Sequence, residues 1–229
     1  MSNFFAAFAS ECGRLFRKSS LRGLLVTLVV LASFGVLVPW MKGFEFLDTR
    51  FVLAYCSIGL LFAGPLMAEM LATDGSSKPA PIVNIARIAL VALYGWTVSS
   101  IMLLIGFAVV NLQHWFGKVL LPATPVLISA LSLGLLASVF VAELTAFLTL
   151  KVSPGAAKIA LRVLFLGVFA LILFGPDSVS DALSRATTTE ALPNLAWKVA
   201  IVLVVLNAGL LIALPKGPTS VVDEAKGEE

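Results

Sequence analysis

The chain has 229 residues, of which 59% are hydrophobic and only 13% carry a charge. A soluble domain is usually about 45–50% apolar and about 25% charged, so this composition excludes an ordinary soluble fold. The apolar residues form uninterrupted runs of about 18 or more, which is long enough to cross a bilayer. The net charge of +3 does not indicate a nucleic-acid partner. Lys and Arg lie instead at the ends of the apolar runs, where they set topology and meet anionic lipid headgroups.

Residues 1–22 predict an amphipathic helix that lies in the membrane interface. Phe4, Phe8, Cys12 and Leu15 recur at helical spacing, whereas polar residues such as Glu11 are expected to fall largely elsewhere around the helix. Basic residues precede the next apolar run, but no small-residue cleavage site follows it. The sequence therefore predicts no cleavable signal peptide.

Six apolar runs follow, and we interpret them as six transmembrane helices that make up residues 23–214. The Gly64-Pro65 pair inside the second run is expected to kink that helix, because proline removes a backbone donor. The polar residues 215–229 predict a disordered tail. The expected spans are Gly23–Trp40, Phe51–Ala72, Ile88–Leu112, Thr124–Leu150, Ala157–Gly175 and Leu195–Leu214.

The distribution of basic residues predicts the orientation of these spans. With the N-terminus in the cytoplasm, 11 of the 16 Lys and Arg residues lie on the cytoplasmic side and 5 lie outside. This asymmetry favours a cytoplasmic location for both termini, which requires an even number of spans. We therefore expect an integral protein of the plasma membrane, the inner membrane in a bacterium.

The residues that usually carry catalysis or bind cofactors are scarce. The chain has one histidine, His114, whereas a transmembrane b-type haem usually needs a pair of ligands. No cluster has metal-ligand spacing, and neither a Gly-x-Ser-x-Gly elbow nor a P-loop is present. We therefore expect no enzyme activity, cofactor or metal. If ATP drives this protein, another chain must bind the nucleotide.

Two carboxylates, Glu69 and Glu143, lie within or near the predicted spans. A charge at the bilayer centre costs about 2.5–3.5 kcal/mol on insertion scales, so such side chains normally face protein or water. One interpretation is a proton relay or polar gate. The favoured interpretation is a structural anchor that pairs with Arg87, Lys151 or a neighbouring helix.

Small residues recur every four positions along the fourth span. Such a ridge lets helix backbones approach closely. It predicts packing within the bundle, and an interface between protomers is the alternative. The ridge consists of Ala130, Gly134, Ser138, Ala142 and Ala146.

The overall layout resembles the membrane subunit of an ABC-2-type transporter. Both have an amphipathic N-terminal helix followed by a basic cluster and six spans. In both, the loop after the second span and the two termini are cytoplasmic. Glu69 and the Asp74-Gly75 pair are similar to the acidic residue and glycine that these permeases often carry there. The resemblance implies that two permease chains form a pathway and that a separate ATPase contacts the N-terminal helix and residues 73–87. The candidate contact residues are Asp74, Gly75, Lys78 and Arg87.

Two other functions remain open from the sequence. One is a non-catalytic integral subunit that scaffolds a larger respiratory or photosynthetic complex. The other is an ion-coupled carrier, or a vitamin-binding membrane subunit, that uses Glu143. The expected partners are membrane lipid and, for the permease, an ATP-binding subunit within a homodimer or hetero-oligomer.

The loop between the second and third spans is expected to lie in the cytoplasm. A cysteine introduced at Ser76 should therefore resist a membrane-impermeant thiol reagent that is added to intact cells, and should react once the cells are opened. Efficient labelling from outside would refute the predicted orientation.

Overall fold

The computed structural model describes residues 2–18, 29, 33, 49–72, 81–113, 124–174 and 191–214. Within these residues all regular secondary structure is α-helical, which confirms the predicted all-α class. The six helices are α1 (Ser2–Lys18), α3 (Thr49–Ala72), α4 (Pro81–Gln113), α5 (Thr124–Leu148), α6 (Pro154–Phe174) and α8 (Ala191–Ala213).

Three of these helices contain apolar stretches that are long enough to cross a membrane. The stretches are Pro81–Ala108 in α4, Thr124–Leu148 in α5 and Asn194–Ala213 in α8. Among the residues of α3 whose side chains are described, the apolar stretch covers Ile58–Ala72. The chain is therefore a membrane protein by the length and composition of its helices. The total of six spans stays a prediction, because the first expected span and the tail after 214 lie outside the described residues, except for Val29 and Ser33.

The start of α4 differs from the one expected. Helix α4 begins at Pro81 rather than near Ile88, so residues 81–87 form its first turns and do not belong to a loop. Proline is favourable at the first position of a helix, because its missing N–H group would have no intrahelical partner there. Helix α3 continues through Pro65 to Ala72, which is the end predicted for this span.

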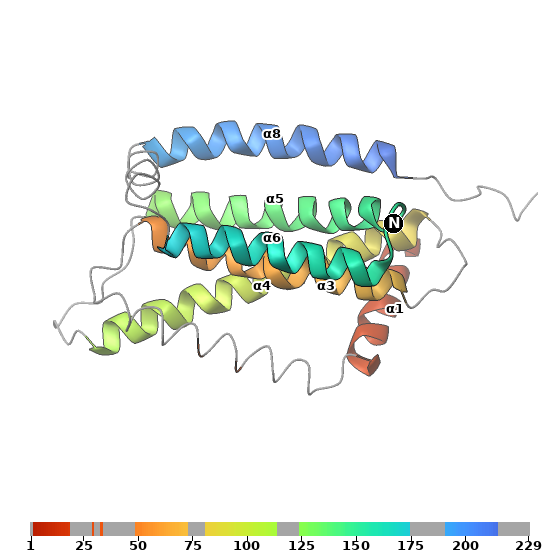
Figure 1. Cartoon of the computed structure of the whole chain (residues 1–229), viewed down its shortest axis with the longest axis horizontal. Helices are drawn as coiled ribbons and strands as arrows, with labels where there is room; N and C mark the ends of the chain where they lie inside the picture. Colours follow the sequence, from red (N-terminus) through yellow and green to blue (C-terminus); the bar gives the residue numbers. More distant parts are fainter. Residues whose placement is uncertain are drawn as a thin grey trace, which may run out of the picture.

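The helices α3, α4, α5 and α6 lie alongside one another, and consecutive helices run in opposite directions (Figure 1). Helix α3 is central, because it packs against α4, α5 and α6. Helix α8 packs against α5, and α1 packs against α4 at the end of the bundle where α3 and α5 finish and α4 and α6 begin. We refer to this as the α1 end of the bundle.

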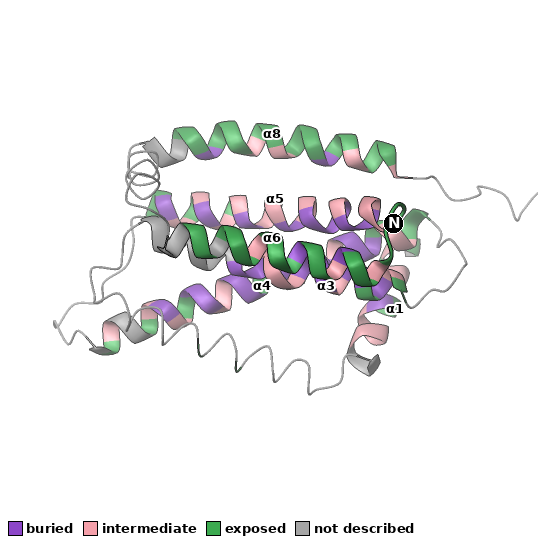
Figure 2. Ribbon diagram, in the orientation of Figure 1, coloured by how far each residue is buried: buried purple, intermediate pink, exposed green. Residues whose placement is uncertain are grey.

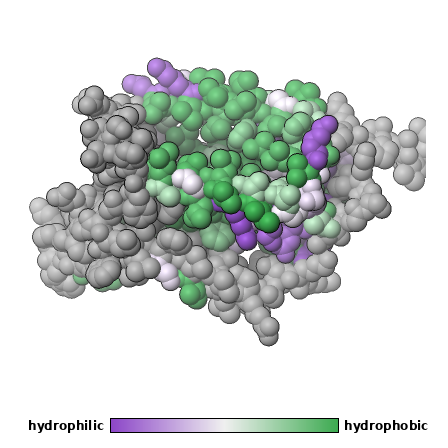
Figure 3. Space-filling model, in the orientation of Figure 1, coloured by the Kyte–Doolittle hydropathy of each residue, from purple (hydrophilic) through white to green (hydrophobic). Residues whose placement is uncertain are grey.

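Burial decreases from the centre of the bundle to its outer helices. The core cluster joins α3, α4 and α5 through fully buried residues such as Met67, Val91 and Ala142. Helices α6 and α8 are largely exposed (Figure 2), and the face on view in Figure 3 is mainly hydrophobic where the residues are described. Val163 is 67% exposed and Ile212 is 77% exposed. Exposed apolar surface of this extent marks contact with a membrane or another protein.

A very close helix crossing in the bundle brings Gly59 of α3 against Gly95 of α4. A Cβ atom at Gly59 would overlap the carbonyl oxygen of Gly95 and the hydroxyl group of Ser99. The Gly59 N–H group donates a hydrogen bond of 2.9 Å to Ser99 Oγ. Close approach through small residues is a common way to pack membrane helices, since lipid gives little hydrophobic drive for association.

Substitution Gly59→Ala is expected to destabilise the protein, because the added methyl group meets a backbone oxygen that cannot move independently. Overpacking of this kind costs about 1–3 kcal/mol. Thermal stability in detergent, followed by fluorescence-detected size-exclusion chromatography, measures the loss. Gly167→Ala in α6 is the matched control, because nothing lies within 4 Å of the added Cβ there. Equal stability of the two variants would contradict the close crossing.

Candidate functional site

Helix α1 docks on the bundle through its apolar stripe. Phe8, Cys12 and Leu15 pack against the core cluster. Phe5, near the start of α1, is 65% exposed, and its ring stacks edge-on against that of Phe4, with 5.6 Å between centroids. The helix is therefore amphipathic, as predicted, but much of its apolar surface contacts protein.

Glu11 lies within the docked face of α1 and is only 7% exposed. We expected this residue largely elsewhere around the helix, and that expectation is wrong. Glu11 is three residues after Phe8 and four before Leu15, a spacing that places all three side chains on one face. An ionised side chain is tolerated in this position because a cation from α4 meets it.

That cation is Arg87, whose side chain is 3% exposed. Its Nη2 atom donates a hydrogen bond of 3.0 Å to Glu11 Oε1. The other carboxylate oxygen, Oε2, lies 3.0 Å from Nη2 of Arg14. Arg14 also donates to the carbonyl oxygen of Met70 at 3.1 Å, near the end of α3, where carbonyl groups lack intrahelical donors. Glu11, Arg14 and Arg87 thus form a charged cluster that joins α1, α3 and α4.

This cluster changes the expected role of Arg87. The residue lies inside α4 and its side chain is occupied by Glu11, so it does not present a free cation to a partner protein. Asp74, Gly75 and Lys78, the other predicted ATPase contacts, lie outside the described residues. Their role stays a prediction.

Glu69 has the anchoring partner that the sequence suggested in general terms. It lies in the last turn of α3, and its Oε2 atom accepts a hydrogen bond of 3.3 Å from Lys158 of α6. The side chains of Glu69 and Lys158 are 62% and 34% exposed, so solvent screens the pair and its contribution to stability is small. The pair joins α3 to α6 at the α1 end of the bundle.

Glu143 is in a different situation. It is fully buried in α5, and neither of its carboxylate oxygens has a hydrogen-bond partner among the described residues. Neither Arg87 nor Lys151, the two cations that the sequence suggested, forms an ion pair with it. A buried polar group without a partner is rare in proteins and calls for an explanation, such as a functional role.

Helical periodicity puts Glu143 on the side of α5 that meets α8. Leu136 lies seven residues before Glu143, so the two residues share a face of α5. The carbonyl oxygen of Leu136 accepts a hydrogen bond of 3.4 Å from Nδ2 of Asn207 in α8. The other oxygen in this region, Asn207 Oδ1, is buried and without a partner among the described residues. The boundary between α5 and α8 therefore contains two polar side chains with unused acceptors.

The small-residue ridge of α5 faces the interior of the bundle. Ala130, Gly134, Ser138, Ala142 and Ala146 are all buried. A Cβ atom on Gly95 of α4 would lie 3.1 Å from Ser138 Oγ, so the ridge contacts α4 closely. These residues pack within one chain. The crossing of Gly59 and Gly95 was not predicted, although Gly59-x-x-x-Ala63 and Gly95-x-x-x-Ser99 have the same small-residue spacing.

No group of His, Cys, Asp and Glu side chains in the described ranges has the arrangement needed to hold a metal ion. No known protein family, characterised protein or solved structure matches the chain. The charged cluster at the α1 end of the bundle and the buried Glu143 are therefore the candidate functional features of the described residues.

The buried pair Glu11–Arg87 is expected to stabilise the protein more than the exposed pair Glu69–Lys158. A double-mutant cycle with Glu11→Gln and Arg87→Gln should give a coupling free energy of about 0.5–3 kcal/mol, which is the range for residues in direct contact. The same cycle with Glu69→Gln and Lys158→Gln should give about 0.2–1 kcal/mol, as for exposed pairs. Denaturant titration of the purified protein measures both cycles, and equal coupling would contradict the difference in burial.

Proposed function

We propose that the chain is the membrane-spanning permease subunit of an ATP-driven exporter of the ABC-2 type, which works with a separate ATP-binding chain. The observation that supports this proposal is the buried pair between Glu11 of α1 and Arg87 of α4. It ties an amphipathic surface helix to a membrane-spanning helix. A transport subunit that is driven from outside the membrane needs such a connection.

The packing of the bundle provides a route for the movement. Arg14 links α1 to α3 through the carbonyl group of Met70, and Arg87 links α1 to the first turns of α4. Helix α3 in turn packs against α5 and α6. A partner that pushes on α1 therefore acts on α3 and α4 together, because α1 is joined to α4 by the buried ion pair and to α3 by the hydrogen bond of Arg14.

The charge distribution supports an ATPase at the same end. Most of the described basic residues lie near the α1 end of the bundle. At the opposite end are Arg50, at the start of α3, and Lys198, in the early part of α8. Lys and Arg accumulate on the cytoplasmic side of membrane proteins. By this rule we expect α1 to lie in the cytoplasm, where ATP is available. The residues near the α1 end are Arg14, Arg87, Lys151, Lys158 and Arg162.

A second function, an ion-coupled carrier, is favoured by one observation. Glu143 is a fully buried carboxyl group without a described partner, and ionisable residues inside membranes often take part in ion or proton pathways. In such a carrier an ion gradient, rather than ATP hydrolysis, supplies the energy.

Purification of the tagged protein in mild detergent, followed by mass spectrometry, tests the permease proposal. We expect a stoichiometric ATP-binding subunit, and we expect the purified complex to hydrolyse ATP. Co-purification of redox or pigment-bearing subunits without an ATPase would contradict the proposal and indicate a scaffold.

In the same complex, Arg87→Gln should reduce ATP-driven transport several-fold while the ATPase subunit stays bound, because the connection between α1 and α4 is weakened. Lys158→Gln, which disrupts an exposed pair at the same end, should have little effect. Transport assays in reconstituted vesicles measure both variants. Uptake that an ion gradient drives without ATP, and that Glu143→Gln abolishes, would favour the carrier instead.

A further inference from the structure

The contact between α8 and the bundle is a single stripe along one face of the helix. From Asn194 to Leu214, the residues of α8 that are not exposed follow one another at alternating spacings of four and three. This is the spacing of a coiled-coil seam. All the other residues in this range are exposed. The stripe consists of Ala196, Ala200, Leu203, Asn207, Leu210 and Leu214. We call the contact between this stripe and α5 the α5–α8 seam.

The α8 side of the seam is aliphatic except for Asn207. Glu143 shares the face of α5 on which Leu136 accepts a hydrogen bond from Asn207. Both oxygens of Glu143 and Oδ1 of Asn207 are buried without a partner among the described residues. Glu143 comes seven positions after Leu136 in α5. Glu143 therefore lies about 10 Å along the seam from the point where Asn207 meets the Leu136 carbonyl group.

Glu143 differs from the other acidic residues that the structure describes. Glu11 is paired with Arg14 and Arg87, and Glu69 is paired with Lys158. A carboxylate in an apolar interior costs several kcal/mol unless a cation or a set of donors compensates for it. The chemistry of the seam therefore fits a ligand that brings a positive charge to Glu143 and an apolar body to the stripe of α8.

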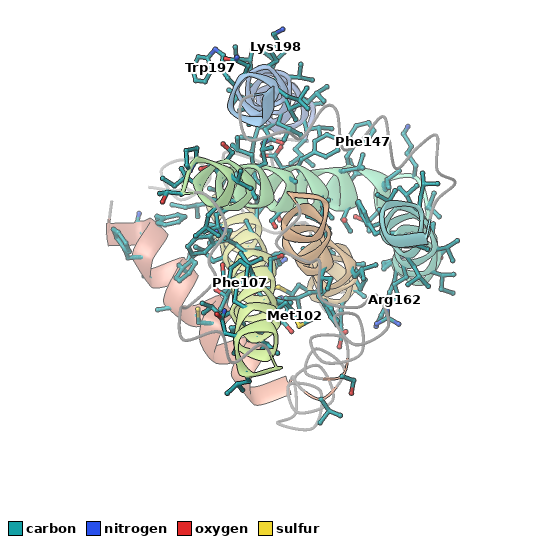
Figure 4. The ribbon with its side chains drawn as sticks, turned by 90° about the vertical axis from the view of Figure 1, so that its left-hand side faces the viewer. Met102, Phe107, Phe147, Arg162, Trp197 and Lys198 are labelled. Atoms are coloured by element: carbon teal, nitrogen blue, oxygen red, sulfur yellow. The ribbon has the colours of Figure 1, made fainter. Side chains whose placement is uncertain are left out.

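Helix α8 lies at the edge of the bundle, between the seam and its surroundings. Helix α8 packs mainly against α5, whereas the core cluster and the crossing of Gly59 with Gly95 lie among α3, α4 and α5. Trp197 and Lys198 point away from the bundle when it is viewed along its axis (Figure 4). A displacement of α8 thus opens the seam to lipid while the core stays packed.

We propose that the α5–α8 seam is a binding site for a lipophilic cation, an amine with an apolar tail that enters from the bilayer. The ammonium group pairs with Glu143. The tail lies along the aliphatic stripe of α8 and reaches the level of Asn207. This inference rests on the proposed export function and names the chemical class of its substrate.

Photo-crosslinking of the full-length chain tests the site without the ATPase. The protein is placed in phosphatidylcholine nanodiscs, and the probe is decylamine that carries a diazirine on its tail. We expect the amine to label peptides of α5 and α8. Labelling should fall several-fold in Glu143→Gln and should be displaced by unmodified decylamine but not by decanol. The corresponding diazirine alcohol should label both proteins weakly and equally.

The matched control is Glu69→Gln, which removes an exposed carboxylate from the same bundle and should leave the labelling unchanged. Equal labelling by the amine and the alcohol, or equal labelling of wild type and Glu143→Gln, would overturn the site. Displacement by decylamine is measured on the wild-type protein, so it tests the site even if Glu143→Gln does not fold. Labelling that unmodified decylamine fails to displace would also overturn the site. Because no ATPase is present, these results do not depend on whether an ATP-binding subunit co-purifies.

Discussion

The ion pair between Glu11 and Arg87 connects the amphipathic helix α1 to the apolar helix α4. Helix α1 is an amphipathic helix at the end of the bundle, whereas α4 contains an apolar stretch long enough to cross the membrane. A buried charge is costly unless a charge of opposite sign compensates for it. Glu11 and Arg87 can therefore both stay ionised in this site only because they are paired. The packing of Phe8, Cys12 and Leu15 on the core, and the hydrogen bond of Arg14 to the end of α3, follow from this docked position.

The interior of the bundle is held by different forces. Lipid is as apolar as a leucine side chain, so the helices gain little from the hydrophobic effect and depend on close contact. Small residues at Gly59, Gly95 and along the ridge of α5 provide that contact. The α5–α8 seam differs, because neither carboxylate oxygen of the buried Glu143 has a hydrogen-bond partner among the described residues. Helix α8 packs mainly against α5, whereas the central helix α3 packs against α4, α5 and α6.

The sequence predicted the all-helical class and the membrane-spanning character, because long apolar runs have few alternatives in a bilayer. The expected boundaries of α5 and α8 were close to those observed. The start of α4 was wrong because Pro81 was taken for a loop residue, although proline also begins helices. The total of six spans stays a prediction.

The site was less predictable than the fold. Glu143 and the basic residues stand out in an apolar sequence, but their partners depend on which helices become neighbours. Arg87 pairs with Glu11, which is 76 residues away in the chain, and periodicity within one helix does not reveal such a contact. The spacing of Phe8, Glu11 and Leu15 does contain the information that Glu11 shares the apolar face. The docking of that face on protein is a tertiary effect.

Hydrogen–deuterium exchange of α1 tests most directly whether the Glu11–Arg87 pair holds this helix on the bundle. The account predicts that the amides of α1 are protected in the wild-type protein. In Arg87→Gln they should exchange much faster, while those of α5 stay protected. Equally fast exchange of α1 in both proteins would show that the helix is not docked, and equally slow exchange would show that the ion pair does not hold it.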